Sequence, residues 1–219
     1  MSAPDLLGAL RQGAQDLGVA LSPQQEQTLL DYVGWIAKWN RVYNLTAVRD
    51  PHDMLVQHIL DSLTVVPALR RYQTQAQLHS IKVLDVGAGA GLPGVVLAIA
   101  CPDVQVACVD TVAKKALFIE QVAAALRLPN LRGIHARVEN LQEAYDVVTS
   151  RAFASLADFT QWSASSLASH GVWMAMKGKH PEAELAELPS KVEVFHVEPL
   201  NVPGLDAERC LIWMRPKHV

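Results

Sequence analysis

The sequence has few cysteines and no long apolar run. Its three cysteines, Cys101, Cys108 and Cys210, match no metal-binding spacing and cannot all pair with one another. We therefore expect free thiols in a reducing, cytoplasmic setting and no bound metal. No segment approaches the roughly 20 apolar residues of a membrane span. The N-terminus also lacks a charged segment followed by an apolar one, so we expect neither membrane insertion nor a secretion signal.

The sequence also lacks an excess of positive charge. It contains 19 Lys and Arg against 22 Asp and Glu, a formal net charge of -3. Nucleic-acid-binding proteins are usually basic, so this balance disfavours a large RNA footprint unless a local basic patch exists. The 219 residues, half of them apolar, suffice for one packed domain with an appended piece. No large surplus of apolar surface is evident, and we expect a monomer.

The most informative stretch is I-K-V-L-D-V-G-A-G-A-G-L-P-G, residues 81–94. Its apolar first part predicts a buried strand, which breaks directly into glycines at positions 87, 89 and 91. Pro93 suits the first turn of the helix that follows. Strand, glycine turn and helix together are typical of the first unit of an open α/β sheet, whose ligand binds at the carboxyl end of the strand.

Asp85, at the end of this strand, indicates which ligand binds. Residues 89–94 fit G-x-G-x-x-G, a weak dinucleotide signal when it stands alone. A carboxylate at this place would repel a pyrophosphate. S-adenosylmethionine carries a sulfonium and an ammonium instead, and both tolerate a carboxylate. We interpret the segment, with Gly87 and Gly89, as a methyl-donor loop; a cap on the following turn is the alternative for Asp85.

The chain divides into a helical first part and an alternating second part. Helical signals occur at 4–18, from Ser22-Pro23 onward and from Asp50-Pro51 onward, and a polar segment at 70–80 reads as a link. We assign 1–72 to an N-terminal helical extension packed on the core and 73–219 to an α/β domain. Further helices are expected at 111–128 and about 155–168. Strands are predicted at 81–86, 104–110, 131–137, 145–150, 171–177, 191–200 and 209–215, which gives a mostly parallel seven-stranded sheet with an antiparallel edge.

Other candidate ligand contacts follow the next strands. Asp110 ends the second strand, 23 residues after Gly87, where a carboxylate suits ribose hydroxyls; it could instead cap the next helix. Val138 and Glu139 follow the third strand, in a position that would face an adenine, although a solvated helix start is equally consistent. Arg151 follows the fourth strand and could hold a phosphate or a base edge. A salt bridge from Arg151 to one of the two aspartates is the alternative.

The sequence offers no general base and no covalent nucleophile for methyl transfer. An N-P-P-Y segment, which would indicate methylation of an exocyclic amine, is absent, and so is a Pro-Cys nucleophile. An acceptor that needs no deprotonation fits this absence. Guanine N7 has a free lone pair, so transfer could be direct in-line displacement that relies on positioning and electrostatics.

Two further groups of residues carry open interpretations. His58 and Asp61 lie on the apolar face of a predicted helix, where a buried histidine with a carboxylate partner is a common structural feature. They could instead line a cleft. The basic clusters are solvated surface unless they converge around the cleft, where they would form the local patch that the net charge hides. These clusters are Lys177, Lys179 and His180, and Arg41, Arg49, Arg70 and Arg71.

From about Trp39 to its end the chain resembles the bacterial RsmG family, also called glucose-inhibited division protein B, the 16S ribosomal RNA guanine-N7 methyltransferases. The segments that carry the resemblance are W-N-R-V-Y-N-L-T at 39–46, H-I-L-D-S-L at 58–63, V-L-D-V-G-A-G-A-G-L-P-G at 83–94, R-V-E at 137–139, S-R-A-F-A-S-L at 150–156 and K-G at 177–178. One departure is Ala88, where many relatives carry a hydroxyl residue.

The resemblance implies a class I (Rossmann-like) methyltransferase fold. It implies that S-adenosylmethionine is held by Gly87, Leu92, Val138, Glu139 and Arg151. The implied substrate is a guanine in the decoding region of 16S rRNA, either naked or in the 30S subunit, and shape recognition of such a folded RNA would help to explain the modest charge.

Three alternatives remain open from the sequence. A methyltransferase for a small molecule or a protein fits the acidic net charge and predicts a cleft without positive potential. A nicotinamide-dependent oxidoreductase predicts NADH binding, against which Asp85 argues. A non-catalytic module would bind donor and product without turnover.

Overall fold

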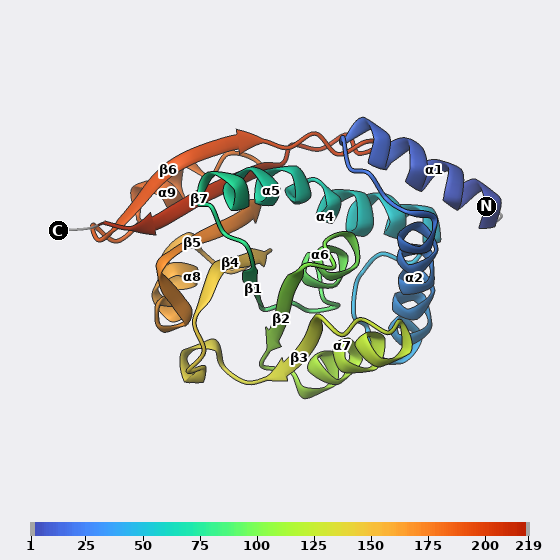
Figure 1. Cartoon of the computed structure of the whole chain (residues 1–219), viewed down its shortest axis with the longest axis horizontal. Helices are drawn as coiled ribbons and strands as arrows, with labels where there is room; N and C mark the ends of the chain where they lie inside the picture. The colour runs from blue at the N-terminus through green and yellow to red at the C-terminus, as the bar shows by residue number, and fades with distance from the viewer. Residues whose placement is uncertain (1–2, 218–219) are drawn as a thin grey trace.

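A seven-stranded sheet forms the centre of the computed structural model, which describes residues 3–217 (Figure 1). The strand order is β3-β2-β1-β4-β5-β7-β6. The first five strands in this order run parallel, and β7 is antiparallel to both of its neighbours. The strands are β1 (Ile81–Val86), β2 (Val104–Asp110), β3 (Leu131–His135), β4 (Tyr145–Arg151), β5 (Leu167–Lys177), β6 (Val192–Pro199) and β7 (Cys210–Pro216). The predicted mostly parallel sheet with an antiparallel edge is confirmed.

The strand order places a crevice at the carboxyl end of β1. The chain leaves β1 toward β2 on one side and later returns to β4 on the other, so β1 lies between them. Asp85 is paired in register with Cys108 of β2 and with Thr149 of β4. Ligands of open parallel sheets bind where the strand order reverses in this way, outside the carboxyl ends of the strands.

Side chains alternate between two apolar layers, one on each face of the sheet. One face, which includes Val83 and Val106, packs against the N-terminal helices, α6 (Gly94–Ala100) and α7 (Ala113–Ala125). The other face, which includes Leu84 and Val148, packs against three shorter elements. These are η2 (Val138–Asn140), α8 (Leu156–Trp162) and α9 (Glu182–Ala186).

The N-terminal helices pack directly on the first of these layers. Helix α1 spans Ala3–Asp16 and α2 spans Pro23–Tyr43. The predicted start of α2 is confirmed: the Ser22 hydroxyl accepts a hydrogen bond from the Gln25 backbone, and the Gln25 side chain accepts one from the Ser22 N–H. None of the described helices combines the length and the apolar character needed to cross a membrane.

A third helical run is longer than the sequence indicated. It contains α3 (Pro51–Met54), the π-helical turn η1 (Leu55–Leu60), α4 (Asp61–Leu63) and α5 (Val65–Gln75). The expected link at 70–80 is therefore helical as far as Gln75. Its polar residues lie on the solvent side, while Ala68 and Leu69 are buried against the sheet.

The helix expected at about 155–168 is shorter than predicted. It ends at Trp162, a 3-10 turn, η3 (Ala164–Ser166), follows, and β5 already begins at Leu167. Ser163 follows the last residue of the helix; its buried hydroxyl donates to the Phe159 carbonyl and accepts the indole N–H of Trp173 in β5. Sequence periodicity could not reveal this contact between the helix end and the sheet.

Candidate functional site

The glycine loop lies on the carboxyl ends of β1 and β2. Gly87, Gly89 and Gly91 all have positive φ, which glycine adopts without strain. The Gly87 N–H donates to the Val109 carbonyl at 2.9 Å, and the Gly89 N–H donates to Asp110 Oδ2 at 2.9 Å. Gly87 is exposed and Gly89 half-exposed, so a ligand can lie against bare main chain.

Asp85 anchors the far end of this loop. Its Oδ2 accepts the Gly94 N–H at 2.8 Å, so the capping alternative is correct for this oxygen. A Cβ at position 94 would lie 2.3 Å from the Cys108 sulfur, which explains the glycine there. The other oxygen, Oδ1, is buried without a hydrogen-bond partner. Burial raises the pKa of Asp85 to about 7, against the opposing effects of the Gly94 N–H and the Arg151 charge.

Asp110 joins the glycine loop to the helix after β2. Its Oδ1 accepts the Val112 N–H at 2.8 Å, and its Oδ2 accepts the Gly89 N–H. The Lys115 ammonium lies 3.9 Å from Oδ2. Asp110 is not the N-cap of α7, because Val112 occupies that position and Asp110 accepts the N–H of Val112. The carboxylate also fixes the loop through Gly89; ribose binding stays a prediction.

Tyr32 of α2 supports the loop from below. Its ring is fully buried, and its hydroxyl donates to the Ala90 carbonyl at 2.5 Å. Leu92, predicted as a donor contact, is buried in the same layer. The sequence does not predict this role of Tyr32, because helical periodicity cannot show a bond to a residue 58 positions away.

Val138 and Glu139 open the 3-10 turn η2 after β3, as the sequence placed them. Val138 is buried, whereas the Glu139 side chain is 35% exposed and accepts a hydrogen bond from Arg137 at 2.9 Å. Its own backbone N–H and then Arg137 hold the pKa of Glu139 below its ordinary value. The carboxylate is therefore charged and accessible beside the crevice.

Arg151 does not pair with Asp85 or Asp110, the partners considered from the sequence. Its Nη1 instead lies 2.9 Å from Asp61 Oδ2 and donates to the Gln57 carbonyl at 2.9 Å. Both partners come from the third helical run, which brings the N-terminal helices against the end of β4. The side chain of Asp61 is almost fully buried, and its Oδ1 accepts from Arg209 Nε at 2.9 Å. One carboxylate thus holds two arginines.

His58 belongs to the same network. Burial, and then the charge of Arg151, lower the pKa of His58 below its ordinary value. A guanidinium can only donate, so Nδ1 of His58, 3.4 Å from Arg151 Nη2, faces it as an acceptor. The proton then resides on Nε2, which lies 2.8 Å from the Thr46 hydroxyl. His58 is a neutral hydrogen-bonding group here, and its partner is not Asp61.

These residues surround a pocket of about 380 Å³, called here the Arg151 pocket. It is lined by Gln57, His58, Asp61, Arg151, Ala152, Met176, Lys177, Gly178 and Arg209. His58 and Asp61 thus border a pocket while their side chains are buried and hydrogen-bonded, so a functional role for them stays a prediction. A larger hollow of about 870 Å³ along the segment before β7 shares Gly178 and Arg209 with it. A concave pocket into which a small number of polar side chains converge is typical of a binding site.

Several cations of the basic clusters are paired with carboxylates. Lys177 lines the pocket, where Glu184 lies 2.7 Å from its ammonium. Arg70 and Arg71 are paired with Asp103 and with a glutamate of β6, so they add no free charge to the crevice. Long-range pairing, invisible in the sequence, decides which cations are neutralised.

Five residues of the site are not predicted by the sequence, because their roles depend on contacts that only the fold creates. They are Tyr32, Thr46, Gln57, Glu184 and Arg209. Thr46 had a signal, because it lies inside a segment that carries the family resemblance. Arg209 had none beyond its place at the start of a predicted edge strand.

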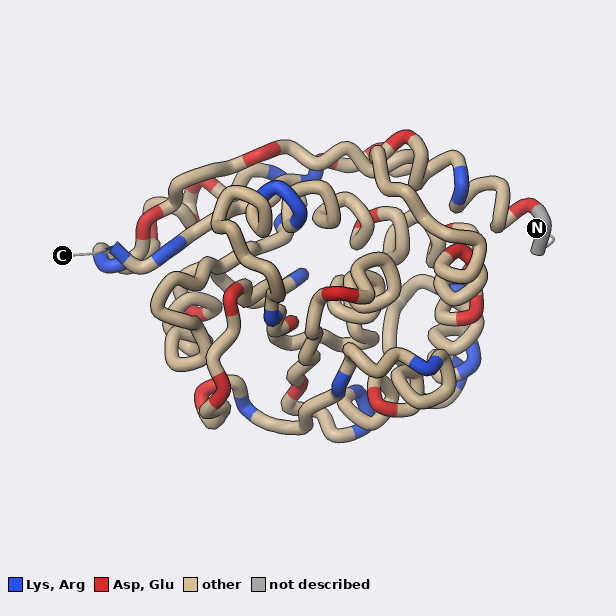
Figure 2. Tube along the Cα trace, in the orientation of Figure 1, with Lys and Arg blue, Asp and Glu red and all other residues tan. Residues whose placement is uncertain are grey.

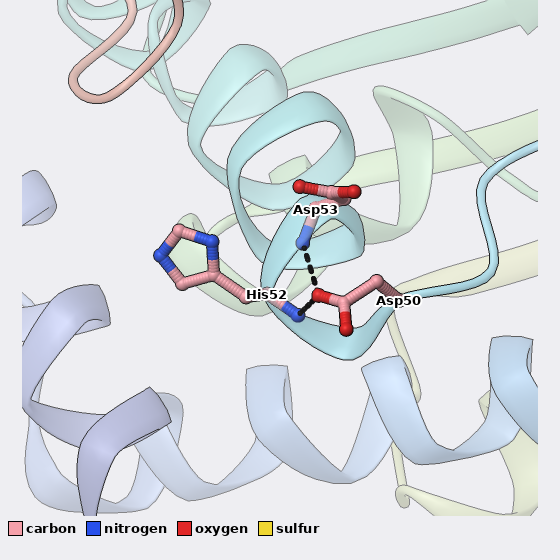
Figure 3. Close-up of side chains that lie close together, drawn as sticks. All are labelled: Asp50, His52 and Asp53. Atoms are coloured by element: carbon pink, nitrogen blue, oxygen red, sulfur yellow. Dashed lines mark hydrogen bonds between the residues drawn. The ribbon is translucent and has the colours of Figure 1, made fainter. Parts of the chain in front are cut away.

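A group of possible metal ligands lies at the start of α3 (Figure 3). Single ligand atoms of Asp50, His52 and Asp53 all lie within 4.8 Å of one another. Asp50 Oδ1 accepts the N–H groups of His52 and Asp53, which is ordinary capping of a helix N-terminus. Asp50 and Asp53 are exposed, and we assign the group no metal.

The chain is similar to known proteins in sequence and in fold. Residues 25–212 match the family GidB, rRNA small subunit methyltransferase G. The chain is 62% identical over 213 residues to the ribosomal RNA small subunit methyltransferase G of Polaromonas naphthalenivorans strain CJ2, covering 97% of this chain and 96% of that protein. It is 60% identical over 221 residues to the protein of the same name from Acidovorax ebreus strain TPSY, covering 99% and 98%.

Two solved structures share the fold. TrmN from Thermus thermophilus aligns with a TM-score of 0.56 and 17% identity over 71% of this chain, which spans 49% of that protein. The ribosomal protein L11 methylase from Lactobacillus delbrueckii subsp. bulgaricus aligns with a TM-score of 0.51 and 16% identity, covering 68% of this chain and 76% of that one. The predicted class I methyltransferase fold is confirmed by these similarities.

Proposed function

The chain belongs to the family of rRNA small subunit methyltransferase G, and from this premise we propose that it methylates N7 of a guanine in 16S rRNA with S-adenosylmethionine as donor. The observation that carries the proposal is the family match, which extends over residues 25–212 and includes both the glycine loop and the Arg151 pocket. The structure supports it with two adjoining places, one for a cationic donor and one for an RNA base.

We propose that the donor lies on the glycine loop. Bound S-adenosylmethionine would supply an electrophilic methyl group. The buried Oδ1 of Asp85, which has no partner among the described residues, fits a positively charged group because a cation would offset its desolvation. The accessible main chain of Gly87 and Gly89 allows close approach, with Leu92 beneath the loop.

The remaining donor contacts would come from the neighbouring strand ends. Each oxygen of Asp110 accepts one backbone N–H, Oδ2 that of Gly89 in the loop and Oδ1 that of Val112. Their remaining lone pairs could accept ribose hydroxyls. Val138 and Glu139 would face the adenine, the first through its backbone and the second through its charged carboxylate. Arg151 lies between the loop and the pocket, where it would position donor or substrate.

We propose that the target guanine enters the Arg151 pocket and reacts without a base. N7 carries a lone pair, so no proton has to be removed before attack. His58 is held neutral by its lowered pKa, and no cysteine lines the described pocket. Arg151 and Arg209, fixed by Asp61, would hold phosphate or base oxygens. Catalysis then rests on positioning for in-line displacement, without a covalent intermediate.

Three further features belong to the proposal. We propose that the enzyme works as a monomer, needs no metal ion and acts in the cytoplasm, where its three buried cysteines stay reduced. We also keep the division into an extension at 1–72 and a methyltransferase domain at 73–219. Light scattering and activity in the presence of a chelator test the first two statements.

The proposed function is tested with labelled S-adenosylmethionine. The protein is mixed with 30S particles from cells that lack this gene and, in parallel, with naked 16S RNA. The RNA is then digested, and methylated nucleosides are identified by mass spectrometry. N7-methylguanosine is the expected product, and the parallel samples show which form of RNA is used. Donor binding without labelled RNA in either sample would overturn the RNA assignment and redirect the search to small-molecule or protein acceptors.

A further inference from the structure

A cationic surface lies where the C-terminal half of α2 and the segment after it meet the start of α7. Helices α2 and α7 lie side by side (Figure 1), and Figure 2 shows Lys and Arg positions along both. We call this the α2–α7 surface. Its members are Lys38, Arg41, Val42, Tyr43, Arg49, Lys114, Lys115 and Leu117. Residues 32–49 and 111–119 together contain five Lys and Arg and not one Asp or Glu, in a chain whose net charge is -3.

Most of these charges are available to a partner. Within the described residues, Lys38, Arg41, Arg49 and Lys114 form no ion pair, unlike Arg70, which is locked to an aspartate. The ammonium of Lys114 lies 5.8 Å from the ring centre of its neighbour on α2 and therefore stays at the surface. Unpaired cations kept together by the fold are what a polyanion needs.

Apolar side chains are exposed among these cations. Val42 is 71% exposed, Tyr43 38% and Leu117 49%. The Tyr43 ring rests on Trp39 at a centroid distance of 5.0 Å, which holds it in place. Cations interleaved with exposed aromatic and aliphatic groups fit RNA, whose phosphates take the charges and whose riboses and unstacked bases take the apolar contacts.

The surface is continuous with the proposed site at two points. Lys115 lies 3.9 Å from Asp110, which holds the glycine loop. The segment that follows α2 reaches the Arg151 pocket through Thr46, whose hydroxyl is hydrogen-bonded to His58. RNA bound across the α2–α7 surface would therefore pass directly beside the pocket.

We propose that the α2–α7 surface binds the phosphate backbone of the small-subunit rRNA that flanks the methylated nucleotide. This inference rests on the proposed function, since it takes rRNA as the substrate. The helical extension then has a second role besides supporting the glycine loop: it supplies half of the RNA-binding face. The acidic net charge and the RNA substrate are reconciled, because the positive charge is concentrated at the site.

The test compares two double variants of the full-length protein. Arg41→Gln with Lys114→Gln removes two charges from the α2–α7 surface. Lys191→Gln with Lys217→Gln removes two charges at the far end of the β6–β7 hairpin and is the matched control (Figure 1). Binding of unmethylated 30S particles is measured at several salt concentrations, with circular dichroism and donor affinity verifying that each variant is folded.

Removing two cations that contact phosphates should make the slope of log K against log salt less steep by about 1.5. Binding near 0.1 M salt should weaken about tenfold. The control should match the wild type. An unchanged affinity would overturn the inference. Weaker binding with an unchanged salt slope would also overturn it, because that result indicates contact with a ribosomal protein. If wild-type protein binds the particles but forms no N7-methylguanosine, the proposed function fails instead.

Discussion

The hydroxyl of Tyr32 donates a hydrogen bond to the carbonyl oxygen of Ala90 at 2.5 Å, which fastens an N-terminal helix to the middle of the glycine loop. The two residues lie 58 positions apart, and both are buried. The N-terminal helices therefore take part in shaping the proposed donor site. This contact gives the extension a role that a separate, appended piece would not have.

Tyr32→Phe should weaken donor binding while leaving the ring in the core. The substitution leaves the buried Ala90 carbonyl without its main donor, a cost of about 1–2 kcal/mol, and allows the loop to move. We expect the Kd for S-adenosylmethionine, measured by calorimetry, to rise about three- to tenfold. Tyr145→Phe is the control, since that hydroxyl bonds Arg132 near the opposite ends of the strands. Equal donor affinity in both variants would refute a positioning role.

Asp61→Asn should disable the Arg151 pocket. The amide can no longer balance two guanidiniums, and both arginines lose their anchoring anion. We expect methyl transfer to 16S rRNA to fall at least tenfold. The free energy of unfolding should drop by about 2 kcal/mol, less than for a fully buried ion pair, because both arginines are partly exposed to solvent.

The control for this variant is Asp103→Asn, which breaks the exposed pair with Arg70. Its activity in the same methylation assay should stay within about twofold of wild type. Loss of activity in both variants, in proportion to their melting temperatures, would mean that Asp61 serves stability alone.

Asp85 should make both donor binding and stability depend on pH. Its pKa of about 7 in the folded chain lies above the ordinary value of 3.8, because burial disfavours the carboxylate. The folded state therefore holds a proton that the unfolded state releases between about pH 4 and 7. The contribution of Asp85 to stability falls as pH rises across that range, by at most about 4 kcal/mol. Above pH 7 it stays constant.

Binding of the cationic donor favours the ionised form, so its affinity should improve about tenfold from pH 6 to pH 8. Asp85→Asn should bind the donor more weakly, remove this pH dependence, and melt at a higher temperature than wild type at pH 8. Calorimetry and thermal melts at pH 5, 6.5 and 8 measure both effects. A variant that retains the wild-type pH profile would show that another group is responsible.

Gly94→Ala should introduce a steric clash at the end of the glycine loop. The new methyl group would lie 2.3 Å from the Cys108 sulfur and 2.9 Å from Asp85 Oδ2, and the strand behind them cannot yield. We expect a loss of about 1–3 kcal/mol in the free energy of unfolding together with weaker donor binding. Gly34→Ala is the control: nothing lies within 4 Å of that position, in an exposed part of α2, so stability should rise by about 0.5–1 kcal/mol. Denaturant melts of both variants would show opposite signs, and equal signs would contradict this explanation.

The amino-acid sequence is enough to predict the sheet, the glycine loop and the positions of Asp85, Asp110, Val138 and Arg151. These follow from local rules: apolar runs form buried strands, glycines form the turn, and parallel strands carry their functional residues at their carboxyl ends. One contact of each of Asp85 and Asp110 is also local, since each carboxylate accepts a backbone N–H within nine positions in the chain.

The fold sets which side chains contact one another. It paired Arg151 with Asp61 rather than with Asp85, bonded Tyr32 to Ala90, and brought Arg209 to the same carboxylate. It also neutralised Arg70, while Lys114 forms no ion pair with any residue between 3 and 217. These pairings join residues tens of positions apart in the sequence. They depend on how the N-terminal helices pack on the sheet, and sequence periodicity carries no record of that packing.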